Sequence, residues 1–421
     1  LVEGGDPQLK HEVILVGAHY DHVGYGSYRN SYGPTGFIHN GADDNASGVA
    51  ALMELAGALS QLPDKPKRTV LIAFWDGEEK GLLGSKYWVD HPTVPLKDLR
   101  LAINVDMIGR MRNSRVEVLG TRTIPNARRL VSRQNAALDL DFNWDLRADS
   151  DHHSFFTRGI PVLMLHTGLH GDYHRPSDDA EKINVEGLEQ IAQLLFNTVV
   201  EAADSASLGH FRSQSRRESQ ASKRAAEVVL PPEPGRLGIE WDVAAARRGE
   251  IVIKSVVPRS AAAQGGLKPG DQLLTFAGRE VTDAEKFRIA VLAANNPVAA
   301  SVKRAGEEQP VPLTLQLAGE PARLGISWRT DDAEPDSVIL TRVTPGSPAE
   351  VAGLRPGEHI QRINGRDFAS SDEFRQLATS LPLPLVLEVE AGGRVRTVEP
   401  PQPDIAPSAE ANDAKPAAEP Q

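Results

Sequence analysis

Side chains that commonly bind metal ions stand just after several short apolar runs in this chain of 421 residues. The side chains are His19, Asp21, Glu78, Glu79, Asp106 and His174. The apolar runs before them cover residues 13–16, 70–75, 101–105 and 161–165. Short continuous apolar runs separated by helical stretches are typical of buried parallel strands. Because open parallel sheets bind ligands beyond the carboxyl ends of their strands, we expect these side chains to share one cleft.

Helical spacing of apolar residues separates these strand-like runs. Residues 47–61 and 185–203 carry apolar side chains three and four positions apart, which is typical of helices packed on a sheet. In the first of these helices we expect Val49, Leu52, Met53, Ala56 and Leu59 to lie on one face. The N-terminal part of the chain therefore predicts an α/β domain with a mixed, mostly parallel sheet flanked by helices.

Paired acidic residues indicate the chemistry of the expected cleft. His19 and Asp21 lie two positions apart, so they project to one side of an extended segment, where the carboxylate can fix the tautomer of the imidazole. Adjacent carboxylates such as Glu78 and Glu79 repel each other unless a cation or a proton lies between them. Asp44 belongs to an acidic pair at a helix start, where one carboxylate would suffice for capping.

A pair of divalent ions would account for this set of side chains. Three carboxylates and two imidazoles can bind two ions when one carboxylate bridges them, and a fourth carboxylate then remains free to act as a base. The chain has no cysteine, so any metal must be held by histidine and carboxylate. Such mixed ligands favour zinc, although manganese and cobalt also fit them.

Composition argues against other classes of function. The formal net charge of −11 disfavours nucleic acid as the main partner, because phosphate binding needs a surplus of lysine and arginine. No apolar stretch approaches the ~20 residues needed for a transmembrane segment. The chain begins with Leu1 and not with methionine. Removal of an upstream signal segment would make the protein secreted or periplasmic, and the sequence alone leaves its localisation undetermined.

The composition changes near residue 205, and an internal repeat follows. Residues 206–231 have few large apolar side chains, which predicts a solvated linker. Leu237-Gly238-Ile239 recurs as Leu324-Gly325-Ile326 at an offset of 87 residues, since 324 − 237 = 87, and this offset stays constant over the whole segment. Two copies of one small β-rich domain are therefore expected. The predicted division is a catalytic domain at 1–205, a linker at 206–231, repeat domains at 232–318 and 319–400, and a disordered tail at 401–421.

The N-terminal part resembles the zinc exopeptidases that include co-catalytic aminopeptidases, glutamate carboxypeptidases and glutaminyl cyclases. The resemblance covers about residues 13–187, and five motifs in the family's order carry it. They are His19-Tyr20-Asp21 and the segments 41–48 (GADDNASG), 77–85 (GEEKGLLGS), 104–109 (NVDMIG) and 172–178 (DYHRPSD). Family members usually carry more chain before the first strand, so we expect either a longer natural chain or an incomplete catalytic domain here.

The resemblance implies a fold, two zinc ions per chain and a role for each matched position. Glu78 would be the general base, Asp21 would support His19, and Tyr173 would donate a hydrogen bond to the developing oxyanion. A cis peptide bond would join Asp44 to Asn45. The implied zinc ligands are His19 and Asp106 at one ion, Glu79 and His174 at the other, and Asp44 at both.

The two repeat domains resemble circularly permuted PDZ domains of bacterial proteases. Leu237-Gly238-Ile239 and Leu324-Gly325-Ile326 match the loop whose backbone N–H groups receive the terminal carboxylate of a peptide. The turns at 266–271 and 353–358 support the same identification. The resemblance implies C-terminal peptides as ligands, and the alternative is a pair of packing domains that bind no peptide.

These features together predict a zinc metallopeptidase, an exopeptidase of the aminopeptidase type that acts on peptides and carries PDZ-like modules. Two alternatives remain open. A glutaminyl cyclase would use a single zinc ion, and a decayed peptidase domain would leave a non-catalytic peptide-binding scaffold. All five implied ligands are present, which argues against both alternatives.

Overall fold

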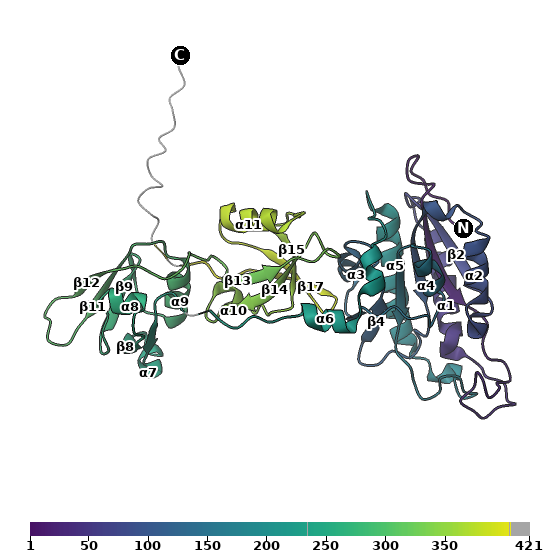
Figure 1. Cartoon of the computed structure of the whole chain (residues 1–421), viewed down its shortest axis with the longest axis horizontal. Helices are drawn as coiled ribbons and strands as arrows, with labels where there is room; N and C mark the ends of the chain where they lie inside the picture. The colour runs from purple at the N-terminus through teal and green to yellow at the C-terminus, as the bar shows by residue number, and fades with distance from the viewer. Residues whose placement is uncertain (234, 404, 406–421) are drawn as a thin grey trace, which may run out of the picture.

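The computed structural model describes residues 1–233, 235–403 and 405 and has three globular parts that lie in a row (Figure 1). The N-terminal domain lies at one end, the second repeat domain in the middle and the first repeat domain at the far end. Within these described residues, none of the helices has the length and apolarity that a membrane crossing requires. The predicted disordered tail at 401–421 falls mostly on residues outside this description.

The N-terminal domain is built on a six-stranded sheet in the order β2-β1-β3-β6-β4-β5. Neighbouring strands pair in parallel except for β4 and β6, which are antiparallel. The prediction of a mixed, mostly parallel sheet is therefore confirmed. The strands are β1 (Val13–His19), β2 (Thr69–Trp75), β3 (Leu99–Val105), β4 (Arg115–Leu119), β5 (Asp139–Asn143) and β6 (Val162–His166).

Helices cover both faces of this sheet. Alternate residues of β1 point to opposite faces, so Ile14 and Val16 pack with helices α1, α3 and α5, whereas Val13 and Leu15 pack with α2 and α4. The helices are α1 (Gly48–Ser60), α2 (Leu83–Asp90), α3 (Ala127–Gln134), α4 (His152–Thr157) and α5 (Val185–Asp204). Short helical turns are η1 (Ala42–Ser47), η2 (Glu78–Lys80), η3 (Leu96–Asp98) and η4 (Ala180–Lys182).

The buried face of α1 only partly matches the expected one, because Val49 and Ala56 are half-buried while Ala51 and Leu55 join the buried stripe. The helix buries Ala51, Leu52, Leu55 and Leu59, whereas Met53 is 64% exposed. Consecutive residues of a helix are about 100° apart, so Met53 turns away from a stripe centred on Leu52 and Leu55.

Each repeat domain is a small antiparallel sheet with one longer helix. The first sheet has the order β12-β11-β9-β8-β7, with β10 paired to β9, and the second has the order β13-β14-β15-β16-β17. The first domain contains β7 (Ile239–Trp241), α7 (Val243–Ala246), β8 (Ile251–Val256), α8 (Ala261–Gln264), β9 (Gln272–Phe276), β10 (Arg279–Glu280), α9 (Ala284–Ala293), β11 (Val298–Lys303) and β12 (Val311–Leu315). The second contains β13 (Ile326–Arg329), β14 (Val338–Val343), α10 (Pro348–Val351), β15 (His359–Ile363), α11 (Ser371–Ser380), β16 (Leu387–Ala391) and β17 (Arg394–Val398).

The segment between the domains is not the solvated linker that its composition suggested. It forms η5 (Ser213–Arg217) and α6 (Gln220–Ala226), and polar contacts hold it to the N-terminal domain. Gln220 donates its backbone N–H to Asp145, and the ammonium of Lys223 donates to the carbonyl of Phe142 at 2.9 Å. Composition misled here because a segment with few apolar residues can still be anchored through backbone carbonyls and ion pairs.

The second repeat domain is docked on the N-terminal domain through a charged interface. Arginines of α3 pair with acidic residues of the repeat domain, and the backbone N–H of Leu140 donates to the carbonyl of Gly392 at 2.9 Å. The ion pairs at this interface include Arg128 with Glu390, Arg129 with Asp367 and Arg133 with Glu388. The repeat domain is therefore held against the N-terminal domain and is not joined to it by a flexible linker alone.

Arg122 is the most connected residue of this interface. Its guanidinium donates to Glu218 of the linking segment and to Asp331 of the second repeat domain, with contacts of 2.8 to 3.0 Å, and it stacks 3.7 Å from the centre of the Trp144 ring. Burial alone would raise the pKa of Asp331, but Arg122 lowers it to about 2. One buried cation thus joins three parts of the chain.

Replacing Arg122 should weaken the whole assembly. We expect Arg122→Ala to reduce the free energy of unfolding by about 1.5–3 kcal/mol, because Glu218 and Asp331 would lose their shared charged donor and keep only Arg212 and Arg329. Arg115→Ala is the matched control, since the Arg115 side chain is 58% exposed in its pair with Asp141, and such surface pairs contribute about 0–1 kcal/mol. Urea unfolding of the full chain measures both, and equal losses would contradict the central place given to Arg122.

Candidate metal and catalytic site

The predicted metal-binding side chains meet at the carboxyl ends of adjacent strands. His19 is the last residue of β1, Glu78 and Glu79 stand in η2 just after β2, and Asp106 directly follows β3. His174 comes from the loop after β6. These strands are neighbours in the order β2-β1-β3-β6, so their carboxyl ends deliver the side chains to one place.

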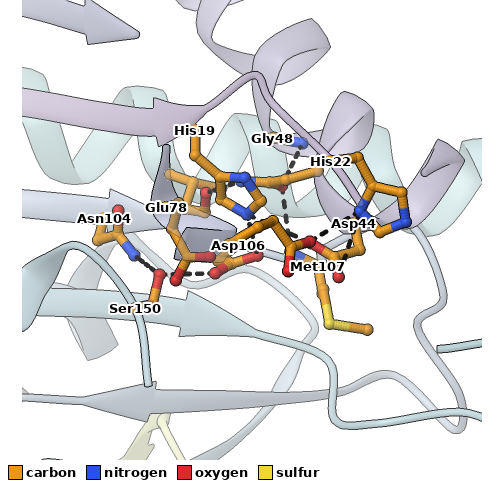
Figure 2. A network of polar contacts seen from close by, with 12 residues as sticks. His19, His22, Asp44, Gly48, Glu78, Asn104, Asp106, Met107 and Ser150 are labelled. Atoms are coloured by element: carbon orange, nitrogen blue, oxygen red, sulfur yellow. Dashed lines mark hydrogen bonds and ion pairs between the residues drawn. The ribbon is translucent and has the colours of Figure 1, made fainter. Parts of the chain in front are cut away.

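Asp44 lies at the centre of the cluster (Figure 2). Its Oδ1 is 3.2 Å from Nε2 of His19, and its Oδ2 is 3.2 Å from Nε2 of His174. Nε2 of His19 is also 3.3 Å from Oδ1 of Asp106, and Nε2 of His174 is 3.1 Å from Oε2 of Glu79. The five implied ligands therefore form two groups that share the carboxylate of Asp44.

The backbone around Asp44 is fixed by a residue that the sequence analysis did not single out. Oδ2 of Asp178, whose side chain is fully buried, accepts hydrogen bonds from the backbone N–H groups of Asp43 and Asp44 at 2.9 and 3.1 Å. The peptide bond between Asp44 and Asn45 is cis, as the resemblance implied. Asp178 stands in the motif at 172–178, but only its burial distinguishes it from the other acidic residues of that loop.

The backbone conformation before Glu78 and a hydrogen bond to its N–H group set the position of this residue. Gly77 precedes it with a φ of 73°, a left-handed conformation that glycine adopts without strain and that turns the chain at the end of β2. Oδ1 of Asp21 accepts the backbone N–H of Glu78 at 3.0 Å. The expected contact of Asp21 with His19 differs in detail, because Nδ1 of His19 lies 3.0 Å from the backbone carbonyl of Asp21 and 3.8 Å from its carboxylate.

Asp106 is oriented by a short chain of hydrogen bonds that Figure 2 shows. Ser150 donates its hydroxyl to Oδ2 of Asp106 at 2.6 Å, and the amide of Asn104 donates to that hydroxyl at 2.7 Å. Oδ1 of Asp106 is thereby left facing His19. Neither Ser150 nor Asn104 could be assigned this role from sequence spacing, because Ser150 is 44 residues away from Asp106.

A cleft of about 390 Å³ opens onto the cluster. Glu78 and Tyr173 both line it, and the Tyr173 ring stacks on His174 with 3.9 Å between ring centres. The other lining residues include Asp44, Asp106, Met107, Glu117, Leu119, Asn143, Asp145, Arg147, Asp149, Met164, His166 and His174. The two predicted catalytic side chains are thus accessible to a ligand in the cleft.

His22 also reaches the cluster, although the sequence analysis did not include it. Its Nδ1 lies 2.8 Å from Oε1 of Glu79 and 3.8 Å from Oδ2 of Asp44. A histidine directly after the motif His19-Tyr20-Asp21 was the available signal. That signal is weak, because the direction of a side chain that follows a strand end depends on the loop.

The carboxylates of the cluster raise the pKa values of the side chains around them. Burial alone would lower the pKa of His19, but Asp106 and Asp44 raise it far above its ordinary value. Burial would likewise lower the pKa of His174, but Asp44 and Glu79 raise it to about 10. Burial and the charge of Asp106 raise the pKa of Glu78 to about 9. In the absence of metal, protons supply the positive charge that these carboxylates require.

The donor atoms fit divalent cations. Two sets of three side chains, each including Asp44, place one possible ligand atom per residue within 4.8 Å of one another. Oε1 of Glu79 and both ring nitrogens of His22 are buried and have no hydrogen-bond partner among the described residues. Unsatisfied buried groups of this kind are uncommon in folded proteins, and a cation would satisfy them. The sets are His19, Asp44 and Asp106, and His22, Asp44 and Glu79.

Comparison with known proteins agrees with this geometry. Residues 2–199 match peptidase family M28, and residues 227–299 and 313–387 each match the PDZ domain. The chain carries a domain of peptidase family M28 followed by two PDZ domains. The identification of the zinc exopeptidase family from five motifs, and of tandem PDZ domains from the repeat, is therefore confirmed.

Several relatives of this M28 domain have been described. The chain is 32% identical over 210 residues to "Aminopeptidase YwaD" of Bacillus subtilis, covering 46% of this chain and 42% of that protein. It is 31% identical over 182 residues to "Leupeptin-inactivating enzyme 1" of Streptomyces exfoliatus, covering 42% of this chain and 37% of that one. The chain thus spans less than half the length of these curated relatives. A solved structure of a zinc aminopeptidase from Bacillus subtilis is 26% identical, with coverage of 50% and 51% and a TM-score of 0.40.

Metal binding should release protons and weaken as the pH falls. Because the carboxylates hold His19 and His174 protonated in the metal-free protein, entering cations must displace about two protons, and affinity should drop from pH 8 to pH 6. Calorimetric zinc titration in buffers of different ionisation enthalpy measures this release. His174→Gln should reduce it by about one proton. A binding enthalpy that is independent of the buffer would contradict the assignment of both histidines.

Proposed function

We propose that this protein is a di-zinc aminopeptidase. His19 and Asp106 would hold one ion, Glu79 and His174 the other, and Asp44 would bridge them. The observation that carries the proposal is that each carboxylate oxygen of Asp44 lies 3.2 Å from a different imidazole, so one side chain belongs to two groups of ligands. A single-zinc cyclase would not need this doubled set.

The chemistry divides between the ions and the side chains of the cleft. When bound, zinc supplies a Lewis acid for the substrate carbonyl and lowers the pKa of water. Glu78 takes a proton from the attacking water as the water oxygen bonds to the peptide carbonyl carbon. The carbon–nitrogen bond then breaks, and Glu78 returns the proton to the leaving amine. Glu78 suits this role because its carboxyl lines the cleft beside the ligand cluster.

Two neighbours of Glu78 would assist. Asp21 holds the backbone N–H of Glu78 and so fixes the direction from which the carboxylate enters the cleft. Burial and the nearby carboxylates raise the pKa of Tyr173, so its hydroxyl stays protonated and can donate a hydrogen bond to the developing oxyanion. The stacking of Tyr173 on His174 limits how far this ring can turn.

The charge of the cleft favours a substrate with a free amino terminus. Glu117, Asp145 and Asp149 line the cleft beside the metal cluster, against one arginine, Arg147. A surplus of carboxylates suits an ammonium group better than a second carboxylate. Relatives named as aminopeptidases point in the same direction.

The general base provides the sharpest test of this mechanism. Glu78→Gln should leave two zinc ions bound while lowering kcat on an aminoacyl-nitroanilide by on the order of 10²–10⁴, because the amide cannot carry the proton. Glu54→Gln, at an exposed position of α1, is the matched control and should leave kcat unchanged. Blocking the substrate amine with an acetyl group should abolish turnover by the unmodified enzyme. A fully metallated Glu78→Gln variant with normal kcat would remove Glu78 from this role.

We further propose that the PDZ domains bind peptide C-termini, chiefly through the first. A cavity of about 260 Å³ lies beside Leu237-Gly238-Ile239 and is lined by Trp241, Phe287 and Arg288 of the first domain and by Thr344 and Pro345 of the second. Gly238 has a φ of 78°, and a Cβ there would lie 2.3 Å from Cβ of Ser260, so glycine is required where a carboxylate would approach the backbone.

The second domain differs at the equivalent place. Its Trp328 donates a hydrogen bond at 2.9 Å to the hydroxyl of Ser371 at the start of α11, which ties β13 to this helix. The first domain has Ala284 at the position 87 residues earlier, since 371 − 284 = 87, and alanine cannot accept this bond.

Peptide binding can be tested with one pair of ligands. A labelled peptide with a free apolar C-terminus should bind the full chain about 10–100-fold more tightly than its C-terminal amide, because hydrogen bonds to a charged group contribute about 1.5–3 kcal/mol. Ala284→Ser should weaken this binding by adding the strand-to-helix bond, and Ser371→Ala should not. Equal affinity for acid and amide, measured by fluorescence anisotropy with the metal removed, would argue that the domains only pack.

A further inference from the structure

We infer that His22 binds the same metal ion as Glu79 and His174, as an additional ligand outside the five that the family motifs imply. This inference rests on the proposed di-metal site. Nδ1 of His22 lies 2.8 Å from Oε1 of Glu79, and Nε2 of His174 lies 3.1 Å from Oε2 of the same carboxylate. Two imidazoles therefore face the two oxygens of one glutamate.

His22 and Glu79 form a close ion pair whose geometry is poor for a hydrogen bond. Although the two atoms are 2.8 Å apart, both count among the buried polar atoms without a hydrogen-bond partner in the described part of the chain. The ring nitrogen and the carboxylate oxygen are thus misaligned for sharing a proton. Ligand atoms on one ion, each about 2.0–2.2 Å from the metal, are commonly about 3 Å apart and aim at a third point.

The surroundings of His22 hold its ring in this orientation. A Cβ at position 41 would lie 2.7 to 2.8 Å from atoms of the His22 ring, so the absence of a side chain at Gly41 makes room for the imidazole. On another side the His174 ring meets it edge-on, with 5.6 Å between ring centres. The ring is therefore packed in place beside Glu79 and is not a surface side chain that happens to approach it.

An extra ligand would make the two ions unequal. One group of side chains would supply four ligands, namely Asp44, Glu79, His174 and His22. The other would supply three, namely His19, Asp44 and Asp106. Zinc sites with four protein ligands are typically closed, whereas sites with three keep a position open for water or substrate. The ion near His22 should accordingly bind more tightly, and the ion near His19 should be the more exchangeable one.

Metal binding by His22 can be measured without relying on activity. Metal-free full-length protein would be titrated with Co²⁺, with stoichiometry from equilibrium dialysis and coordination from visible absorption. His22→Gln should bind one of its two ions at least 10-fold more weakly and change the absorption of that ion. His39→Gln is the matched control. His39 is also buried, with its ring centre 6.4 Å from that of His22, but both of its ring nitrogens already form hydrogen bonds, one with Ser31 and one with the carbonyl of Phe37. The control variant should behave as the unmodified protein.

A second measurement uses only the unmodified protein, so it still tests the inference if the His22→Gln variant does not fold. X-ray absorption of the unmodified protein with two Zn²⁺ ions should detect three coordinated imidazoles per chain, where a site without His22 would have two. Two imidazoles, or unchanged cobalt affinity and absorption in a folded His22→Gln variant, would overturn the inference and leave His22 as a packing residue. Unmodified protein that binds fewer than two ions would instead overturn the di-zinc proposal itself.

Discussion

The crowding of negative charge at the carboxyl ends of the central strands is the constraint on which the site depends. Asp44, Glu79 and Asp106 lie within hydrogen-bonding range of the same two imidazoles, and Glu78 stands beside them. Like charges at this spacing cannot all remain ionised in a buried place without compensating cations. The raised pKa values of the histidines and of Glu78 are the response of the metal-free protein to that excess.

Backbone contacts keep this repulsive arrangement in place. Asp178 holds the N–H groups that lead into Asp44, and Asp21 holds the N–H of Glu78, so two further carboxylates stabilise the turns and stay out of the ligand set. Neutral donors then orient Asp106 through Ser150 and Asn104. Because Asp44 and Asp106 are fixed by groups from other segments, this part of the cluster is ordered without a cation, and less binding energy is lost in ordering side chains.

One side of the cleft in the M28 domain is connected to the second PDZ domain through a chain of contacts. Asn143 and Asp145 line the cleft and also contact Gln220 of the linking segment, while Trp144 between them lies under the Arg122 guanidinium that reaches Asp331 of the second PDZ domain. The second PDZ domain thus adjoins the loop that forms one side of the cleft. The first PDZ domain has a cavity beside Trp241 and lies farther from the M28 domain (Figure 1).

Sequence alone predicted the central strands, the duplication and most of the side chains that meet in the cluster. The strands follow from local periodicity, the duplication from a constant offset, and the cluster from residues at strand ends and from the family motifs. It could not supply Asp178 or the direction of His22, whose roles depend on contacts between segments far apart in the chain, such as Asp178 with Asp44 across 134 residues. Nor could it show that the linking segment docks beside β5 or that the second PDZ domain docks on α3. Charged surface residues carry no periodic signal, and only the tertiary structure decides which arginine meets which carboxylate, because that pairing depends on the relative position of whole domains.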